Sequence, residues 1–183
     1  MNFLKEVFSY ICGQQHNWVL CGVTLPCCQR CTGLYVGACF ALIFVVVFRP
    51  RPSAFQYWIH GAFMLAMFPF GFHLVEHGGL VRTFTGMLFA MGLVYYLALN
   101  PFSAWNVWRD LRTSLMVAYL SLIAAAAVLL LVMVYTGGVI TGLFLTALAA
   151  LGLAVLVLLT LSNLIVLPGI LRLLFRRSIP SPP

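Results

Sequence analysis

The chain has 183 residues, of which 63% are hydrophobic and 7% are charged, and its formal net charge is +7. A soluble domain carries about 25% charged residues, so this composition excludes an ordinary water-soluble protein. It also excludes a nucleic-acid-binding protein, because every Lys and Arg lies outside the long apolar segments and no basic run alternates with aromatic residues. The lipid bilayer is the expected partner.

The first 31 residues are predicted to form a polar, cysteine-rich head. Met1–Ile11 has the pattern of a short amphipathic helix lying in the membrane interface. Five of the six cysteines follow between Cys12 and Cys31. Cys28 and Cys31 form a CxxC pair, in which two thiols can close a disulfide or hold one metal ion. The N-terminus of the following helix and Arg30 favour a thiolate at Cys31.

A four-ligand metal set can be drawn from this head, with Cys12 or His16 joining Cys21, Cys28 and Cys31. The spacing between the first half of this set (Cys12 or His16, with Cys21) and the second half (Cys28 and Cys31) is shorter than in common zinc ribbons. Thr32 follows Cys31, which excludes a CxxCH haem attachment. A structural disulfide or inert thiols remain the alternative. Cys27 is expected to point away from Cys28, and Cys39 to be a small packing residue.

Five apolar segments are long enough to cross a bilayer as helices, which takes about 20 residues. They are Thr32–Phe48, Tyr57–Val75, Thr83–Leu99, Ser114–Tyr135 and Val139–Leu161. The predicted fold is an all-α, polytopic membrane bundle of about five helices. We divide it into a head (1–31), a three-helix core (32–99), a linker (100–113), a two-helix hairpin (114–167) and a basic, proline-rich tail (168–183).

Positive charge predicts the orientation of the bundle. With five crossings, seven arginines share one side, and one lysine and two arginines share the other. The first group is Arg49, Arg51, Arg109, Arg112, Arg172, Arg176 and Arg177, and the second is Lys5, Arg30 and Arg82. Positive residues concentrate on the cytoplasmic side, so we expect a multi-pass protein of the cell (inner) membrane with its N-terminus outside and its C-terminus in the cytoplasm.

The outer end of the second segment carries a second cluster of polar residues. His73, Glu76 and His77 read HxxEH, the inverted zinc-protease pattern. A protease would need a further acidic ligand, and only Glu6 and Asp110 remain. These residues can instead complete a metal site, relay protons or be interfacial histidines at a helix end. Glu76 is expected to pair with Arg82 or Arg30, and His60 to be a hydrogen-bonded core residue.

Glycines predict which helices pack together. Gly33 and Gly37 lie in the first segment, and Gly86 and Gly92 in the third. Small residues allow close approach of membrane helices, so these two segments should pack together and bring Cys31 near Arg82.

Two motifs resemble those of a known family. They are Leu25-Pro26-x-Cys28-x-Arg30-Cys31-Thr32-Gly33-x-Tyr35-x-Gly37, and Glu76 followed by Arg82-Thr83-Phe84-Thr85-Gly86. This pattern is similar to a prokaryotic membrane family catalogued as domain of unknown function 2085, over roughly residues 12–95. The resemblance implies one shared site containing Cys12, Cys28, Arg30, Cys31, Glu76 and Arg82. Gly13 stands where the family commonly has a histidine, so His16, His73 or His77 would have to supply an imidazole.

Three functions remain open, and the residues name no substrate. The first is metal binding, with zinc as the preferred ion. The second is a small non-catalytic subunit of a larger membrane complex, with structural cysteines. The third is a thiol–disulfide oxidoreductase that passes electrons to a quinone. The predicted ligands are Cys12, His16, Cys28, Cys31, His73 and His77, supported by Arg30, Glu76 and Arg82.

Overall fold

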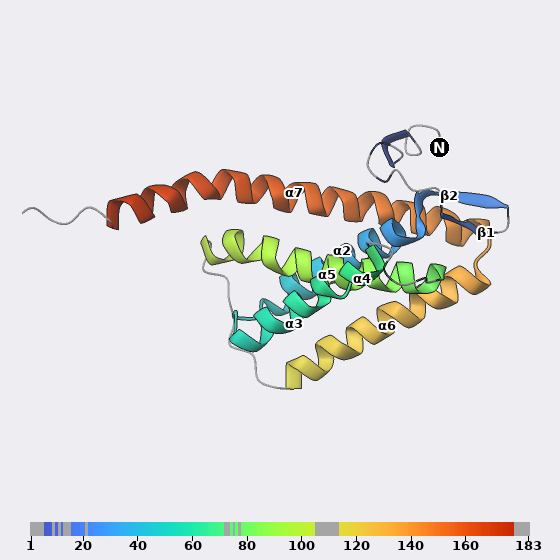
Figure 1. Cartoon of the computed structure of the whole chain (residues 1–183), viewed down its shortest axis with the longest axis horizontal. Coiled ribbons are helices and arrows are strands. Elements are labelled where there is room, and N and C mark those ends of the chain that lie inside the picture. Colours follow the sequence, from blue (N-terminus) through green and yellow to red (C-terminus); the bar gives the residue numbers. More distant parts are fainter. Residues whose placement is uncertain are drawn as a thin grey trace, which may run out of the picture.

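The computed structural model shows a helical bundle with one small strand hairpin (Figure 1). It describes residues 6–8, 10, 12, 16–20, 22–71, 74, 76, 78–104 and 114–177. The elements are β1 (Asn17–Leu20), β2 (Val23–Cys28), α2 (Gln29–Phe48), α3 (Ala54–Leu65), α4 (Phe68–Gly71), α5 (Gly79–Ala104), α6 (Ser114–Thr136) and α7 (Val139–Arg177). Within these ranges, four helices are long and apolar enough to cross a membrane: α2, α5, α6 and α7. The prediction of an all-α membrane bundle is confirmed.

The second predicted crossing, Tyr57–Val75, is not one continuous helix. Helix α3 ends at Leu65, a turn follows, and α4 spans only four residues. Pro69 explains the break, because it has no N–H to donate to the carbonyl of Leu65, four residues earlier. The described residues therefore contain four helices of spanning length where about five were expected.

Helices α2 and α5 run side by side in the same direction. A Cβ added to Gly33 would collide with the backbone of Thr83, and one added to Gly37 would lie 2.8 Å from the carbonyl oxygen of Met87. The contacts advance by four residues on both helices, which is the signature of parallel packing. The predicted packing of the first and third segments is confirmed, and the chain between them returns to the end of the bundle from which α2 starts.

Helix α7 covers another face of α2, and α6 lies at the periphery. A Cβ on Gly152 of α7 would collide with the backbone of Tyr35 of α2. In the membrane-spanning part of α2, 56% of the residues are buried, whereas in that of α6 only 22% are buried. Helices α5 and α7 also extend further than predicted, through Pro101 to Ala104 and through Pro168 to Arg177. The expected linker and tail therefore begin inside helices.

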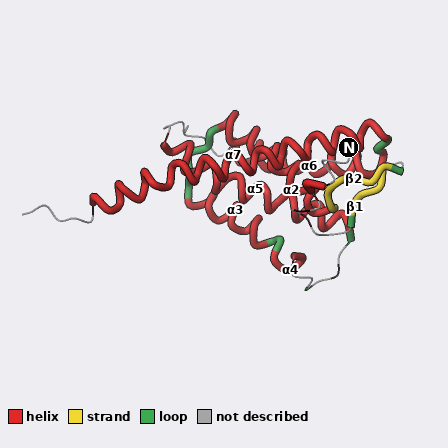
Figure 2. The backbone as a smooth tube through the Cα atoms, turned by 90° about the horizontal axis from the view of Figure 1, so that it is seen from above, coloured by secondary structure: helices red, strands yellow, loops and turns green. Residues whose placement is uncertain are grey.

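The cysteine-rich head contains an antiparallel hairpin, which is absent from the predicted all-α fold. Strands β1 and β2 pair around Gly22, whose φ of 78° suits a glycine in a tight turn. Leu20 and Leu25 pack against Val36 of α2. Figure 2 shows the hairpin at one end of the bundle, beside the start of α2. The hairpin therefore fixes the position of Cys28, the last residue of β2.

Candidate metal centre

Three thiols converge where the hairpin meets α2. The sulfur atoms of Cys12, Cys28 and Cys31 all lie within 4.8 Å of one another. The sulfur atoms of Cys31 and Cys12 lie 3.3 Å apart, within hydrogen-bond distance for sulfur. No disulfide joins the described cysteines. Three soft ligand atoms, drawn from the N-terminal segment, the end of β2 and the first turn of α2, therefore share one small volume.

Cys28 is held by local backbone geometry. It is the N-cap of α2, with extended backbone angles, and its sulfur accepts the backbone N–H of Cys31 at 3.4 Å. The hydroxyl of Thr32 donates to the Cys28 carbonyl at 3.0 Å. The pKa of the Cys28 thiol is lowered, first by the hydrogen bond from the Cys31 side chain. The Cys28 sulfur thus caps the N-terminus of α2 in the position where Ser or Asp is usual. Its lowered pKa favours the thiolate form.

Cys27 and Cys39 lie outside this cluster. Cys27 is buried, and burial raises the pKa of its thiol to about 11. Its sulfur lies 3.4 Å from the Thr32 oxygen. Because that hydroxyl proton is directed to the Cys28 carbonyl, the Cys27 thiol is the donor. Cys39 is buried in α2, with its sulfur 3.5 Å from the Leu148 carbonyl. Both positions match the predicted structural roles.

Neither described histidine, His16 or His60, belongs to the cluster. The His16 carbonyl accepts the Gln29 N–H at 2.8 Å, so its backbone lies beside the start of α2, but the residue is exposed and its ring is not among the grouped ligand atoms. Cys21, His73 and His77 lie outside the described residues. His60 is buried and bonds Tyr119 at 2.7 Å, as expected of a core histidine.

The predicted ion pair of Glu76 is not formed. Glu76 is exposed, and within the part of the chain that the structure describes it pairs with neither Arg30 nor Arg82. Arg30 instead donates to the Phe70 carbonyl at 2.8 Å. The expectation of a pair at membrane depth assumed that the loop would fold Glu76 inward, whereas the break after α3 leaves it at the surface.

The thiols and the arginines share one end of the bundle but occupy different faces of α2. Cys31 packs beside Tyr35 and Ala149, on the side facing α7. Arg30 faces α5, where a Cβ on Gly86 would lie 3.2 Å from its Cγ. Successive residues of a helix point about 100° apart, so adjacent positions can serve two separate faces.

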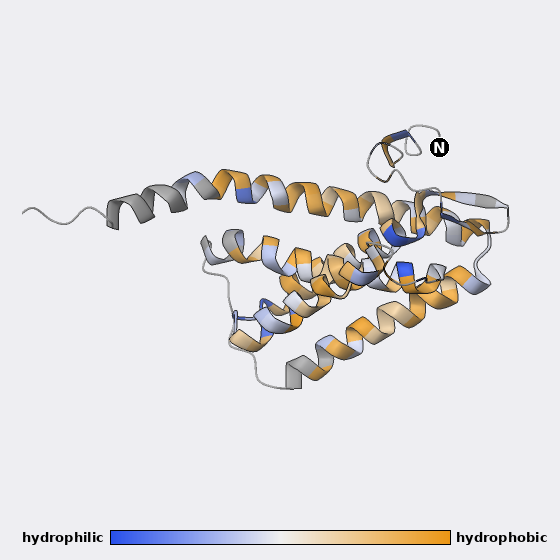
Figure 3. Cartoon of the chain, viewed as in Figure 1, coloured by the Kyte–Doolittle hydropathy of each residue, from blue (hydrophilic) through white to orange (hydrophobic). Residues whose placement is uncertain are grey.

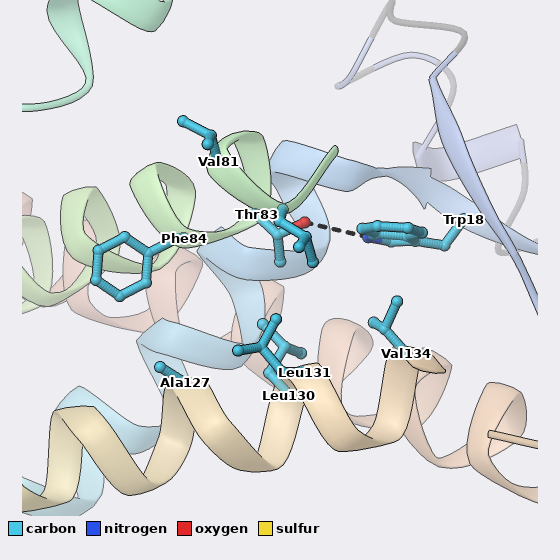
Figure 4. Close-up of a pocket in the computed structure, with 9 residues that line it drawn as sticks. Trp18, Val81, Thr83, Phe84, Ala127, Leu130, Leu131 and Val134 are labelled. Carbon is cyan, nitrogen blue, oxygen red and sulfur yellow. Dashed lines mark hydrogen bonds between the residues drawn. The ribbon is translucent and has the colours of Figure 1, made fainter. Parts of the chain in front are cut away.

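A cavity of about 260 Å³ lies between β1, α5 and α6 (Figure 4). Its lining is almost entirely apolar, and the indole N–H of Trp18 is directed to the Thr83 hydroxyl at 3.1 Å. The lining residues are Trp18, Leu80, Val81, Thr83, Phe84, Ala127, Leu130, Leu131 and Val134. The cavity offers no metal-binding or titratable side chain, so the thiol cluster is the stronger candidate for chemistry.

Residues 12–96 match the model of a family described as a predicted membrane protein (DUF2085). The match confirms the family assignment for this segment. It contains all three clustered thiols, Arg30, Arg82 and helices α2 to α4, and it ends within α5. Helices α6 and α7 lie outside it. No curated protein and no solved structure matches the chain.

Proposed function

We propose that this protein is a multi-pass protein of the cell membrane that binds one zinc ion at the outer membrane face. Cys12, Cys28 and Cys31 would be three of its ligands. The observation that carries the proposal is the approach of these three sulfurs to within 4.8 Å of one another, from segments that are separate in the chain. Thiolate clusters of this kind select zinc among the common divalent ions.

The spacing of the sulfurs fits a tetrahedral ion. A Zn–S bond of about 2.3 Å places neighbouring sulfurs about 3.8 Å apart. The 3.3 Å separation of Cys12 and Cys31 is slightly shorter, so the two would move apart by a few tenths of an ångström on binding. We assign the fourth position to His16, whose backbone already contacts the start of α2 through Gln29. His73 and His77 are the alternatives, since His60 is buried in the core and hydrogen-bonded to Tyr119.

The outer location rests on the distribution of arginines. Helices α2 and α5 start at one end of the bundle, so the chain between them must return to that end even though α3 is short. Arg49 and Arg51 follow the opposite end of α2. The positive-inside rule then assigns the arginine-rich end to the cytoplasm and the thiol cluster to the exterior.

Elemental analysis combined with thiol counting on the detergent-purified protein tests this proposal. Wild-type protein should contain stoichiometric zinc, and chelation should release new reactive thiols. Cys28→Ser is the most informative variant, because serine retains a capping oxygen for α2 while removing the thiolate. Cys39→Ser is the matched control, because Cys39 lies outside the cluster.

The expected result is loss of zinc in Cys28→Ser and Cys31→Ser, with wild-type zinc content in Cys39→Ser. His16→Ala should bind zinc more weakly, but the zinc that it binds should still protect the three thiols from the thiol reagent. A monodisperse wild-type protein that takes up no zinc when metal is supplied under reducing conditions would contradict the proposal.

Thiol–disulfide exchange is a second candidate, favoured by the 3.3 Å contact between the Cys12 and Cys31 sulfurs. Oxidation of two of the three thiols to a disulfide would require loss of two protons and transfer of two electrons to an acceptor such as a quinone. Thiol counting with and without reductant separates the two functions, because a disulfide releases thiols to a reductant and a zinc site releases them to a chelator.

A further inference from the structure

The starts of α2 and α5 hold a second group of polar side chains, on the face of α2 away from the thiols. Figure 3 shows these first turns as hydrophilic interruptions in ribbons that are otherwise largely hydrophobic. They carry Arg30 in α2 and Arg82 in α5. The metal proposal does not use either guanidinium as a ligand.

Arg30 is buried and only partly hydrogen-bonded. Its exposed fraction is 6%, and one terminal nitrogen donates to the Phe70 carbonyl at 2.8 Å. Its Nε is buried without a hydrogen-bond partner. A guanidinium has five N–H donors and no acceptor, so it can be satisfied only by carbonyls, anions or water.

Arg82 lies on the neighbouring helix, one turn before the glycine that packs against Arg30. Gly86, one turn after Arg82 on the same face of α5, packs directly against Arg30. The Nε of Arg82 is also buried and without a partner. Helical side chains lean toward the N-terminus, so both arginines extend toward the same end of the bundle, where α2, α4 and α5 meet.

This junction has an excess of positive charge. Neither arginine forms an ion pair with an acid in the described part of the chain, and Glu76 is exposed. Two helix N-termini add their own partial positive charge at the same place. Like charges brought together at low dielectric repel, and a buried cation without a counter-charge is costly. An anion placed between the guanidiniums removes both costs.

We propose that Arg30 and Arg82 form a binding site for a phosphate-type oxyanion at the membrane surface. Guanidinium groups match phosphate oxygens through paired N–H donors, and the unpartnered Nε atoms supply such donors from two directions. The anion is borne either by the headgroup of an anionic phospholipid or by a soluble phosphate. The site is separate from the thiol cluster and does not depend on metal binding.

Thermal unfolding of the full-length, detergent-purified protein tests the site. One arm compares inorganic phosphate with chloride at equal ionic strength. The other arm compares phosphatidylcholine vesicles with vesicles that also contain phosphatidylglycerol. The variants are Arg82→Gln, Arg30→Gln and Arg82→Lys. Arg51→Gln is the matched control, because Arg51 is an exposed arginine beyond the opposite end of α2.

The proposal expects phosphate or phosphatidylglycerol to raise the unfolding temperature of wild-type protein and of Arg51→Gln. Apparent affinity should fall about tenfold or more in Arg82→Gln and Arg30→Gln, and less in Arg82→Lys, because a lysine keeps the charge but not the paired donors. Arg82→Gln keeps the test valid if the more buried Arg30→Gln fails to fold. A response in the vesicle arm alone identifies a lipid headgroup, and a response to inorganic phosphate identifies a soluble anion.

Two results would overturn the proposal. One is the absence of any response to both anions, or an equal response in wild type and Arg82→Gln. The other is a response that appears only in Glu76→Gln, since it would show that Glu76 itself occupies the arginines in the native protein.

Discussion

At the scale of single residues, the described cysteines have different environments although they lie close together in the sequence. Cys12 and Cys31 are partly exposed, whereas Cys27, Cys28 and Cys39 are buried. Cys27 is also kept protonated by burial, with its pKa raised to about 11. The thiolate is the reactive form of cysteine, so exposure and pKa together predict which thiols react first.

We therefore expect metal-free protein treated with iodoacetamide near pH 8 to be alkylated first within the cluster of Cys12, Cys28 and Cys31, where two thiols are partly exposed and the pKa of the Cys28 thiol is lowered. Cys27 should remain unmodified, because its raised pKa keeps it a thiol until the pH approaches 11 and because reagent cannot reach it. Peptide mass spectrometry after timed quenching measures the order. Zinc should slow alkylation of the three clustered thiols and leave Cys27 and Cys39 unchanged. Cys39 is the internal control, and alkylation of Cys27 at the rate of Cys31 would show that this description of the thiols is wrong.

At the scale of elements, the contact between α2 and α5 positions the whole site. Gly33 is the tightest point, because a Cβ there would collide with the Thr83 backbone. We expect Gly33→Ala to destabilise the protein by about 1–3 kcal/mol, since overpacking at a close contact forces backbone shifts. Thermal unfolding in detergent measures the change.

Gly169→Ala is the matched control for that variant. Gly169 lies in α7, and a Cβ there would meet no atom within 4 Å. Alanine is a better helix former than glycine, so this variant should be neutral or slightly more stable. Equal effects of the two substitutions would mean that the close contact of α2 with α5 does not stabilise the bundle.

Some of these elements could be predicted from the sequence, and the physical reason is local. Apolar length alone locates α2, α5, α6 and α7. The small residues Gly33 and Gly37 of α2 indicate a close contact with another helix, which is α5. Gly92 was assigned to the same contact but faces the His60 backbone of α3. A glycine shows that something approaches closely, but not which neighbour does so.

The candidate site was less predictable. The CxxC spacing indicates that Cys28 and Cys31 can share a ligand, and the structure adds Cys12 to them. The hairpin that positions Cys28 was missed, because the cysteines and Pro26 obscure its alternation and Gly22 was not interpreted as a turn. The predicted ion pair of Glu76 was wrong because complementary charges in a sequence do not specify the path of the loop that carries Glu76.

At the scale of the whole molecule, the two proposed sites lie at one end of the bundle, on two faces of α2. The thiol face is covered by α7, and the arginine face by α4 and α5. Helix α6 contributes to neither and is the least buried of the spanning helices. A metal ion and an anion at the same end would therefore act on a single helix terminus, and both would be reached from the same side of the membrane.

That side can be identified by labelling introduced cysteines in intact cells. Thr24→Cys places an exposed thiol in the hairpin, and Ala54→Cys places one at the exposed start of α3, at the opposite end of α2. If positive charge sets the orientation as expected, a membrane-impermeant maleimide should label Thr24→Cys above the wild-type background in intact cells. Ala54→Cys should be labelled only after permeabilisation. The reverse pattern would place the thiol cluster in the cytoplasm, where thiols stay reduced. It would overturn the outer location of the proposed zinc site and remove the oxidising environment that disulfide chemistry needs, but zinc binding by the three thiols would remain possible.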